Sequence, residues 1–109
     1  MNAPKSIKIG SITYQVKVMP ARDLWAASGV DLLGQSKFIE AELQVREGMP
    51  DDRSAQVLLH EAIHAIEETG GLDLDEKTVR AIGSGVFALL RDNPELTTYL
   101  MQAGNEPPV

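Results

Sequence analysis

The segment Val57–Glu68 constrains this chain more than any other part of its sequence. It contains His60, Glu61 and His64 in the order His-Glu-x-x-His. On an α-helix, residues four positions apart lie one turn apart on the same face, so the two imidazoles can reach one metal ion. A helix is favoured here by apolar residues at helical spacing, namely Leu59, Ala62, Ile63 and Ile66. The segment therefore predicts a helix that presents a metal site.

Glu61 lies about 100° around that helix from His60, at 3.6 residues per turn. This position flanks the metal, where a general base for a metal-bound water molecule is needed. The chain has 2 histidines, and both fall within the motif. The competing interpretation is a pair of half-exposed helix histidines beside an acidic helix end.

Length and composition describe one globular domain with a modest core, since the chain has 109 residues, 43% of them hydrophobic. It has no cysteine, which excludes disulfides and zinc–thiolate sites and fits a cytoplasmic protein. No long apolar run and no signal peptide are visible, so we expect no membrane partner. The net charge of −6 and the scattered basic residues argue against nucleic acid. No feature indicates an oligomeric state.

The residues before the motif predict a small sheet. Ile7–Ile9 and Ile12–Val18 alternate apolar and polar residues around a two-residue turn at Gly10-Ser11. Beyond this hairpin we expect a short helix and two more strands, at 22–27, near 35–40 and near 42–47. A helix across 37–47 is the alternative to the last two strands, because Glu and Ala are frequent there.

Helices are expected from the motif to the end of the chain. The motif helix begins at Asp51 or Asp52, either of which can cap it, and ends at Gly70-Gly71. The next helix is capped by Asp73 or Asp75. Its predicted apolar face consists of Val79, Ile82, Val86, Leu89 and Leu90.

Two features of the C-terminal third predict how these helices pack and end. Gly83 and Gly85 cost helix propensity, so we expect them where two helices approach closely. Asn93 and Pro94 break the second helix and start a short third one that runs through Met101, with Asn93 as its cap and Pro94 at its first position. The chain is thus predicted to be a single α+β domain over 7–103, with flexible tails at 1–6 and 104–109.

A third metal ligand is needed, because catalytic zinc usually takes three protein ligands and a water. Glu67 and Glu68 continue along the motif helix, about 5 Å or more beyond His64. One straight helix cannot place three side chains around one ion, so we reject both as direct ligands. A second element must return to the metal, and its first acidic residues are Asp73, Asp75 and Glu76. For Glu76 the alternative role is a capping box with Asp73.

The segments Leu58–Ile66 and Asp75–Ile82, closed by Asp92-Asn93-Pro94, resemble the minimal gluzincin-type metallopeptidases, including small phage-borne and ImmA/IrrE-like zinc peptidases. The resemblance implies a zincin-like fold in which an N-terminal sheet packs on the motif helix. It also implies one zinc ion per chain, with Glu76 as the third ligand beside His60 and His64. Many gluzincins carry an acidic residue four positions after the ligand glutamate, which orients a zinc-bound histidine. Arg80 stands there, so that support must come from elsewhere.

The predicted activity is peptide-bond hydrolysis, with Glu61 as the general base and a peptide or protein as the substrate. The possible donors to the oxyanion or the substrate are Tyr14, Tyr99, Arg80 and Arg91. An extended substrate is expected to add to a sheet edge near 35–40, and the acidic chain favours basic or neutral peptides.

The alternative is a catalytically silent zinc module with a regulatory or assembly role in a phage or bacterium. In that case, or in a latent enzyme, the tails or the helix 94–103 would cover the metal.

Overall fold

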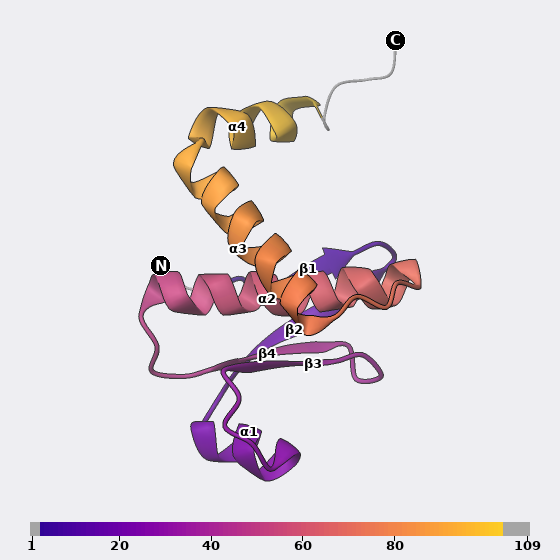
Figure 1. The fold of residues 1–109 in the computed structure, drawn as a ribbon, viewed down its shortest axis with the longest axis vertical. Helices are drawn as coiled ribbons and strands as arrows, with labels where there is room; N and C mark the ends of the chain where they lie inside the picture. Colours follow the sequence, from indigo (N-terminus) through magenta and orange to yellow (C-terminus); the bar gives the residue numbers. More distant parts are fainter. Residues whose placement is uncertain (1–2, 104–109) are drawn as a thin grey trace.

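The structure is a computed structural model that describes residues 3–103 of the chain. In that range, a four-stranded mixed sheet packs against the helix α2, and three further helices complete the α+β fold (Figure 1). The elements follow the order β1, β2, α1, β3, β4, α2, α3 and α4. Within the described residues, no helix is both long and apolar enough to cross a membrane.

The sheet has the strand order β1-β2-β4-β3. β1 (Ser6–Ile9) and β2 (Ile12–Met19) form the predicted hairpin, in which Gly10 takes a φ of 63°. β4 (Glu42–Arg46) pairs in parallel with β2, and β3 (Gly34–Lys37) pairs antiparallel with β4. β3 therefore forms one edge of the sheet, and the alternative helix across 37–47 is wrong.

The core lies between the sheet and α2 (Asp51–Gly70). Its buried members come from β2, β4 and α2: Tyr14, Leu43, Val45, Leu58, Ala62 and Ala65. The predicted apolar stripe of α2 is wrong in part, because Ile66 is 53% exposed. The face that packs on the sheet runs through Leu58, Ala62 and Ala65, which turns Ile66 towards solvent.

The helix ends follow the predictions except for the residues expected to cap α2 and α4. Pro50 occupies the N-cap position without a side-chain bond, so neither Asp51 nor Asp52 is the N-cap residue, although the Asp52 carboxylate accepts from Arg53 N at 2.9 Å. Both aspartates lie in the first turn, where a negative charge favours the helix dipole. α2 ends as predicted, since Gly71 takes the left-handed conformation at a φ of 68°. α1 (Ala21–Ser28) ends in the same way at Gly29.

α3 (Glu76–Asp92) crosses α2 at Gly83, which is buried. A Cβ at Gly83 would lie 3.4 Å from Ile63 Cδ1, so this glycine permits the close approach that was predicted. Gly85 faces open space, so the prediction is wrong there. Much of the expected apolar face also stays exposed, including Ile82 and Leu89, because α3 extends beyond α2 (Figure 1).

α4 (Pro94–Ala103) begins at Pro94 as predicted and packs against α3. Asn93 does not cap it with its side chain, which instead donates to the Leu89 carbonyl at the end of α3. At the other end of the chain, β1 begins at Ser6, within the predicted tail 1–6, and Val16 N donates to the Lys5 carbonyl just before it. Residues 3–4 have no regular structure, and the other predicted tail residues, 1–2 and 104–109, lie outside the described range.

Candidate metal centre

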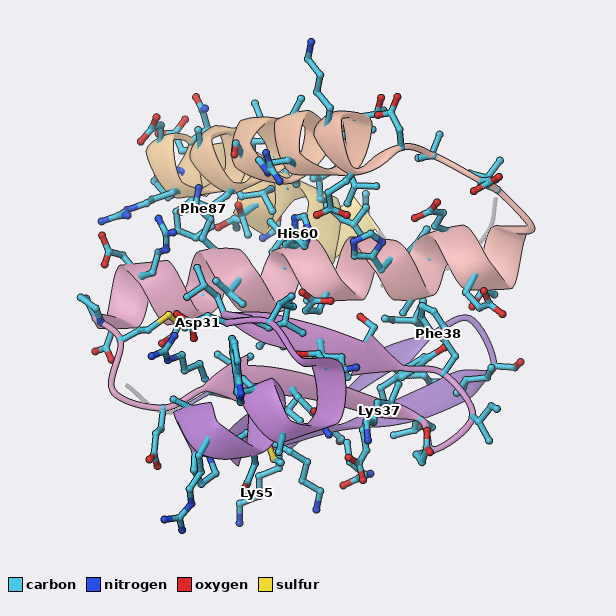
Figure 2. The ribbon with its side chains drawn as sticks, turned by 60° about the horizontal axis from the view of Figure 1, so that its bottom comes forward. Lys5, Asp31, Lys37, Phe38, His60 and Phe87 are labelled. Atoms are coloured by element: carbon cyan, nitrogen blue, oxygen red, sulfur yellow. The ribbon has the colours of Figure 1, made fainter. Side chains whose placement is uncertain are left out.

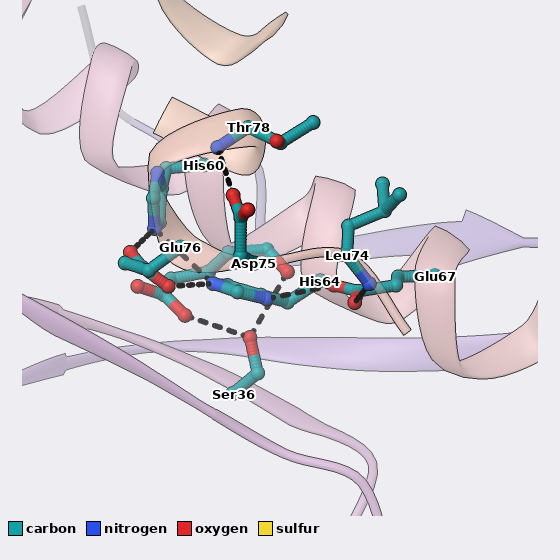
Figure 3. A network of polar contacts seen from close by, with 9 residues as sticks. Ser36, His60, His64, Glu67, Leu74, Asp75, Glu76 and Thr78 are labelled. Atoms are coloured by element: carbon teal, nitrogen blue, oxygen red, sulfur yellow. Dashed lines mark hydrogen bonds and ion pairs between the residues drawn. The ribbon is translucent and has the colours of Figure 1, made fainter. Parts of the chain in front are cut away.

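His60, His64 and Glu76 converge on one point between α2 and α3 (Figure 3). The Glu76 carboxylate lies 2.7 Å from His60 Nε2 and 3.1 Å from His64 Nε2. The two Nε2 atoms are 3.2 Å apart. The three side chains can therefore hold a metal ion, and the structure brings together the three ligands predicted from the sequence.

The spacing of these atoms fits a small divalent cation. Ligand atoms at about 2.0–2.1 Å from a tetrahedral ion lie about 3.3 Å from one another. The distance between the two Nε2 atoms, 3.2 Å, and that between His64 Nε2 and Glu76 Oε2, 3.1 Å, are close to that value. Glu76 Oε1 lies nearer to its histidine, at 2.7 Å from His60 Nε2. Two imidazoles and one carboxylate also form the donor set of known catalytic zinc sites that keep a position for water.

Glu76 is free for this role because a different residue caps α3. Asp75 occupies the N-cap position, and its carboxylate accepts from Thr78 N at 2.7 Å. This bond lowers the pKa of the Asp75 carboxyl. Glu76 is the first helical residue, so the capping box of Asp73 with Glu76 is wrong. The cap at Asp75 fixes the start of α3, and Glu76, the next residue, points back at the two histidines of α2.

Glu67 orients one of the two histidines, a role that an acidic residue at position 80 was expected to have and that Arg80 cannot fill. It is buried, at 9% exposure, and its Oε1 lies 3.1 Å from His64 Nδ1. A carboxylate oxygen only accepts, so this contact favours the tautomer of His64 with its proton on Nδ1, in which Nε2 can bind a metal. The other oxygen, Oε2, accepts from Leu74 N at 2.6 Å. Glu67 thus fixes both a ligand and the loop that leads to Glu76.

The rejection of Glu67 and Glu68 as direct ligands agrees with this geometry, since the metal cluster includes neither. The sequence reasoning missed the positioning role of Glu67. Its signal was the spacing His64-x-x-Glu67, which places a carboxylate one turn after a ligand on the same helix face.

Glu61 lies beside the cluster and is held by the sheet. The Ser36 hydroxyl lies 2.8 Å from Glu61 Oε1 and 2.9 Å from the Glu61 carbonyl, and it can donate to either. Burial raises the pKa of the Glu61 carboxyl above its usual value, against the hydrogen bond from Ser36 and the nearby histidines. A carboxylate with a raised pKa beside a metal site suits proton transfer. No local pattern in the sequence indicates Ser36, because its contact with Glu61 spans 25 residues of chain.

A cavity of about 380 Å³ opens beside the metal cluster. His60, Glu61, Glu76 and Arg80 line one part of it, and Asp31–Gly34 and Arg53 line another. Figure 2 shows His60 in the space between α2 and α3, with Asp31 on the opposite side of α2. The cavity thus joins the metal cluster to the start of β3.

Of the predicted oxyanion or substrate donors, only Arg80 lines this cavity. Tyr14 is 1% exposed in the core between the sheet and α2. Tyr99 is 66% exposed on α4 and lines a separate shallow hollow with residues of that helix. Arg91 lies 4.0 Å from Asp52 and stacks over Phe87.

Gly34 allows β3 to lie close to α2. A Cβ at this position would lie 2.7 Å from Val57 Cγ1 and 2.9 Å from the Gln44 carbonyl. Both distances are too short for a side chain without movement of the neighbours. The glycine therefore sets the distance at which Ser36 meets Glu61.

Comparisons of the chain with protein-family models, with curated proteins and with solved structures find no match. What the chain does is therefore inferred from the geometry of its site.

Proposed function

We propose that this chain is a zincin-like zinc peptidase that hydrolyses peptide bonds. The observation that carries the proposal is the arrangement of a carboxylate, Glu61, beside three convergent ligands on two helices. A structural zinc site would be closed by four protein ligands, whereas the described residues supply three to this cluster, which borders a cavity. An open coordination position next to a general base is what metal-assisted hydrolysis requires.

The chain's own residues then have distinct tasks. His60, His64 and Glu76 would hold the zinc ion, which when bound lowers the pKa of water towards 7 and polarises a carbonyl oxygen. Glu61 takes a proton from the attacking water and passes it to the leaving amine. Ser36 holds the Glu61 carboxylate in place through the bond to Oε1. Glu67 keeps the proton of His64 on Nδ1.

The substrate is proposed to bind as an extended strand along β3. This strand lies at the edge of the sheet, and its residue Ser36 touches Glu61. A peptide that pairs with the free edge of β3 would therefore run past the metal cluster. Arg80 lines the cavity there and is the remaining donor of those predicted from the sequence.

The test is Glu61→Gln, compared with wild type for zinc content and for cleavage of a mixed peptide library read by mass spectrometry. Gln is nearly isosteric but cannot accept a proton at neutral pH, so we expect zinc to be retained and cleavage to fall on the order of a hundredfold or more. His60→Ala combined with His64→Ala should lose both. Equal zinc content in wild type and in that double variant would contradict the metal site.

A second candidate is a zinc-binding regulatory or assembly module without turnover. It is favoured by the exposed apolar side chains on α3 and α4, which include Ile82, Leu89, Leu100 and Met101 and resemble a surface for a protein partner. A zinc-loaded wild type that cleaves no member of the library would favour this module over the peptidase.

A further inference from the structure

The cavity beside the metal cluster is lined by two arginines whose guanidinium groups make no ion pair with the residues that the structure describes. Arg53 on α2 and Arg80 on α3 both line it. Within residues 3–103, neither guanidinium makes an ion pair or a side-chain hydrogen bond, whereas Arg22, Arg46 and Arg91 each have a carboxylate within 4.0 Å. Two unpaired cations on the walls of one cavity are available to a ligand.

The acidic residues of the same cavity do not neutralise these arginines. Asp31 is bound by Arg46, with 2.7 Å between Nη1 and Oδ1. Glu76 faces the two histidines, and Glu61 is held by Ser36. A divalent ion in the cluster would offset the charges of Glu61 and Glu76 together. With the metal bound, Arg53 and Arg80 thus give the cavity a net positive charge.

The positions of the two arginines place that charge near the reacting bond. Arg80 lies one turn after Glu76 on α3, so their Cβ atoms are about 6 Å apart. Arg53 lies seven residues before His60, which is about 10 Å along the axis of α2. An extended peptide advances about 3.3 Å per residue. A group held by these arginines would therefore lie within about three residues of the scissile bond.

We propose that Arg53 and Arg80 bind a substrate carboxylate, so that the site selects peptides with a negative charge close to the cleaved bond. The carboxylate comes from an Asp or Glu side chain or from the C-terminus of the peptide. A guanidinium binds a carboxylate through two parallel hydrogen bonds, which gives orientation as well as affinity. This substrate class rests on the proposed peptidase function.

The proposal reverses the preference expected from the net charge of the chain. The overall charge of −6 predicts basic or neutral substrates. Charges on the far surfaces of the protein are screened beyond about 8–10 Å at physiological salt, whereas Arg53 and Arg80 line the cavity itself. The local charge should therefore decide which peptides bind.

The experiment compares wild type with Arg53→Ala, Arg80→Ala and the double reversal Arg53→Glu/Arg80→Glu. The peptide library contains matched Asp/Asn and Glu/Gln pairs at each position, with free and amidated C-termini. We expect wild type to prefer the charged member at one position by on the order of tenfold, and each alanine variant to lose that preference. The double reversal should instead prefer the uncharged member of the pair at that position. If the preferred charge lies at an internal position of the peptide, the bound carboxylate is that of an Asp or Glu side chain. If the preference is lost when the C-terminus is amidated, the bound carboxylate is the C-terminus.

Arg22→Ala is the control, because it removes the same charge from α1, outside the cavity. Zinc content and thermal unfolding are measured for every variant to exclude a loss of metal or of fold. Equal charge preference in wild type and in the double reversal overturns the proposal.

A binding measurement separates this proposal from the proposed function. Zinc-loaded Glu61→Gln is titrated with the fluorescent Asp and Asn peptides of one matched pair. Arginine-dependent binding without cleavage by wild type would support the carboxylate site and contradict the peptidase. Cleavage by wild type, with binding that does not change in the Arg53 and Arg80 variants, would support the peptidase and contradict the carboxylate site.

Discussion

At the scale of single residues, Glu67 has the most specific effect on the metal cluster. It contacts His64 Nδ1 with one oxygen and Leu74 N with the other. Among residues 3–103, only Glu67 makes hydrogen-bond contacts both to a proposed ligand side chain and to the loop before Glu76. Replacing the Glu67 carboxylate should therefore weaken metal binding, although Glu67 is not itself a proposed ligand.

We predict that Glu67→Gln lowers zinc affinity by about 10- to 100-fold, the range typical of the loss of such a partner. If the Gln oxygen accepts from Leu74 N, its amide group faces His64 Nδ1. The ring must then accept at Nδ1 and carry its proton on Nε2, where the metal should bind. Zinc competition against a chelating dye measures the change.

Glu68→Gln is the matched control, because Glu68 is the exposed neighbour on the same helix. It should bind zinc as wild type does. Identical affinities for Glu67→Gln and Glu68→Gln would show that the contact to His64 has no role in metal binding.

At the scale of elements, the approach of β3 to α2 decides whether Ser36 reaches Glu61. Gly34 allows this approach, since a Cβ there meets Val57 and the Gln44 carbonyl at 2.7 Å and 2.9 Å. Neither Val57, in α2, nor the backbone of β4 can move without disturbing the core between sheet and helix.

We predict that Gly34→Ala destabilises the fold by about 1–3 kcal/mol, as overpacking usually does, and lowers the proposed peptidase activity by displacing β3. Gly85→Ala is the counterpart, because its Cβ meets nothing within 4 Å and Ala favours a helix. That variant should be stabilised by about 0.5–1 kcal/mol. Urea unfolding measures both, and equal stability of the two variants would contradict the close approach.

At the scale of the whole molecule, the metal cluster joins two parts that otherwise share few buried side chains. In α3 only Val79 and Gly83 are buried among the described residues, and α4 has none. The body of sheet and α2 has its own core. The long axis of 51 Å reflects the projection of α3 and α4 from that body (Figure 1).

We predict that zinc removal loosens α3 and α4 while the sheet and α2 remain protected. A ligand that binds only the native state stabilises it by about 2.7 kcal/mol at 100 times its dissociation constant. Hydrogen exchange with and without a chelator should show the loss of protection over residues 76–103. The His60→Ala/His64→Ala variant should show no response to the chelator, and a uniform loss over the whole wild-type chain would contradict this division.

The sequence by itself determined the local features. Helical spacing around His60 and His64, the turn at Gly10-Ser11 and the breaks at Gly70-Gly71 and Pro94 each predicted an element that the structure contains. These signals are local because they depend on periodicity and on backbone freedom, which neighbouring residues fix. The resemblance to minimal gluzincins pointed to Glu76, although spacing alone left Asp73 and Asp75 open.

Only the tertiary structure decided which side chains meet. The bond of Ser36 to Glu61 joins residues 25 apart, and the cavity joins Arg53 to Arg80 across two helices. The burial of Tyr14 depends on which face of the sheet α2 covers, and the exposure of Ile66 depends on which face of α2 packs on the sheet. Such contacts follow from the packing of whole elements, which no short stretch of sequence encodes.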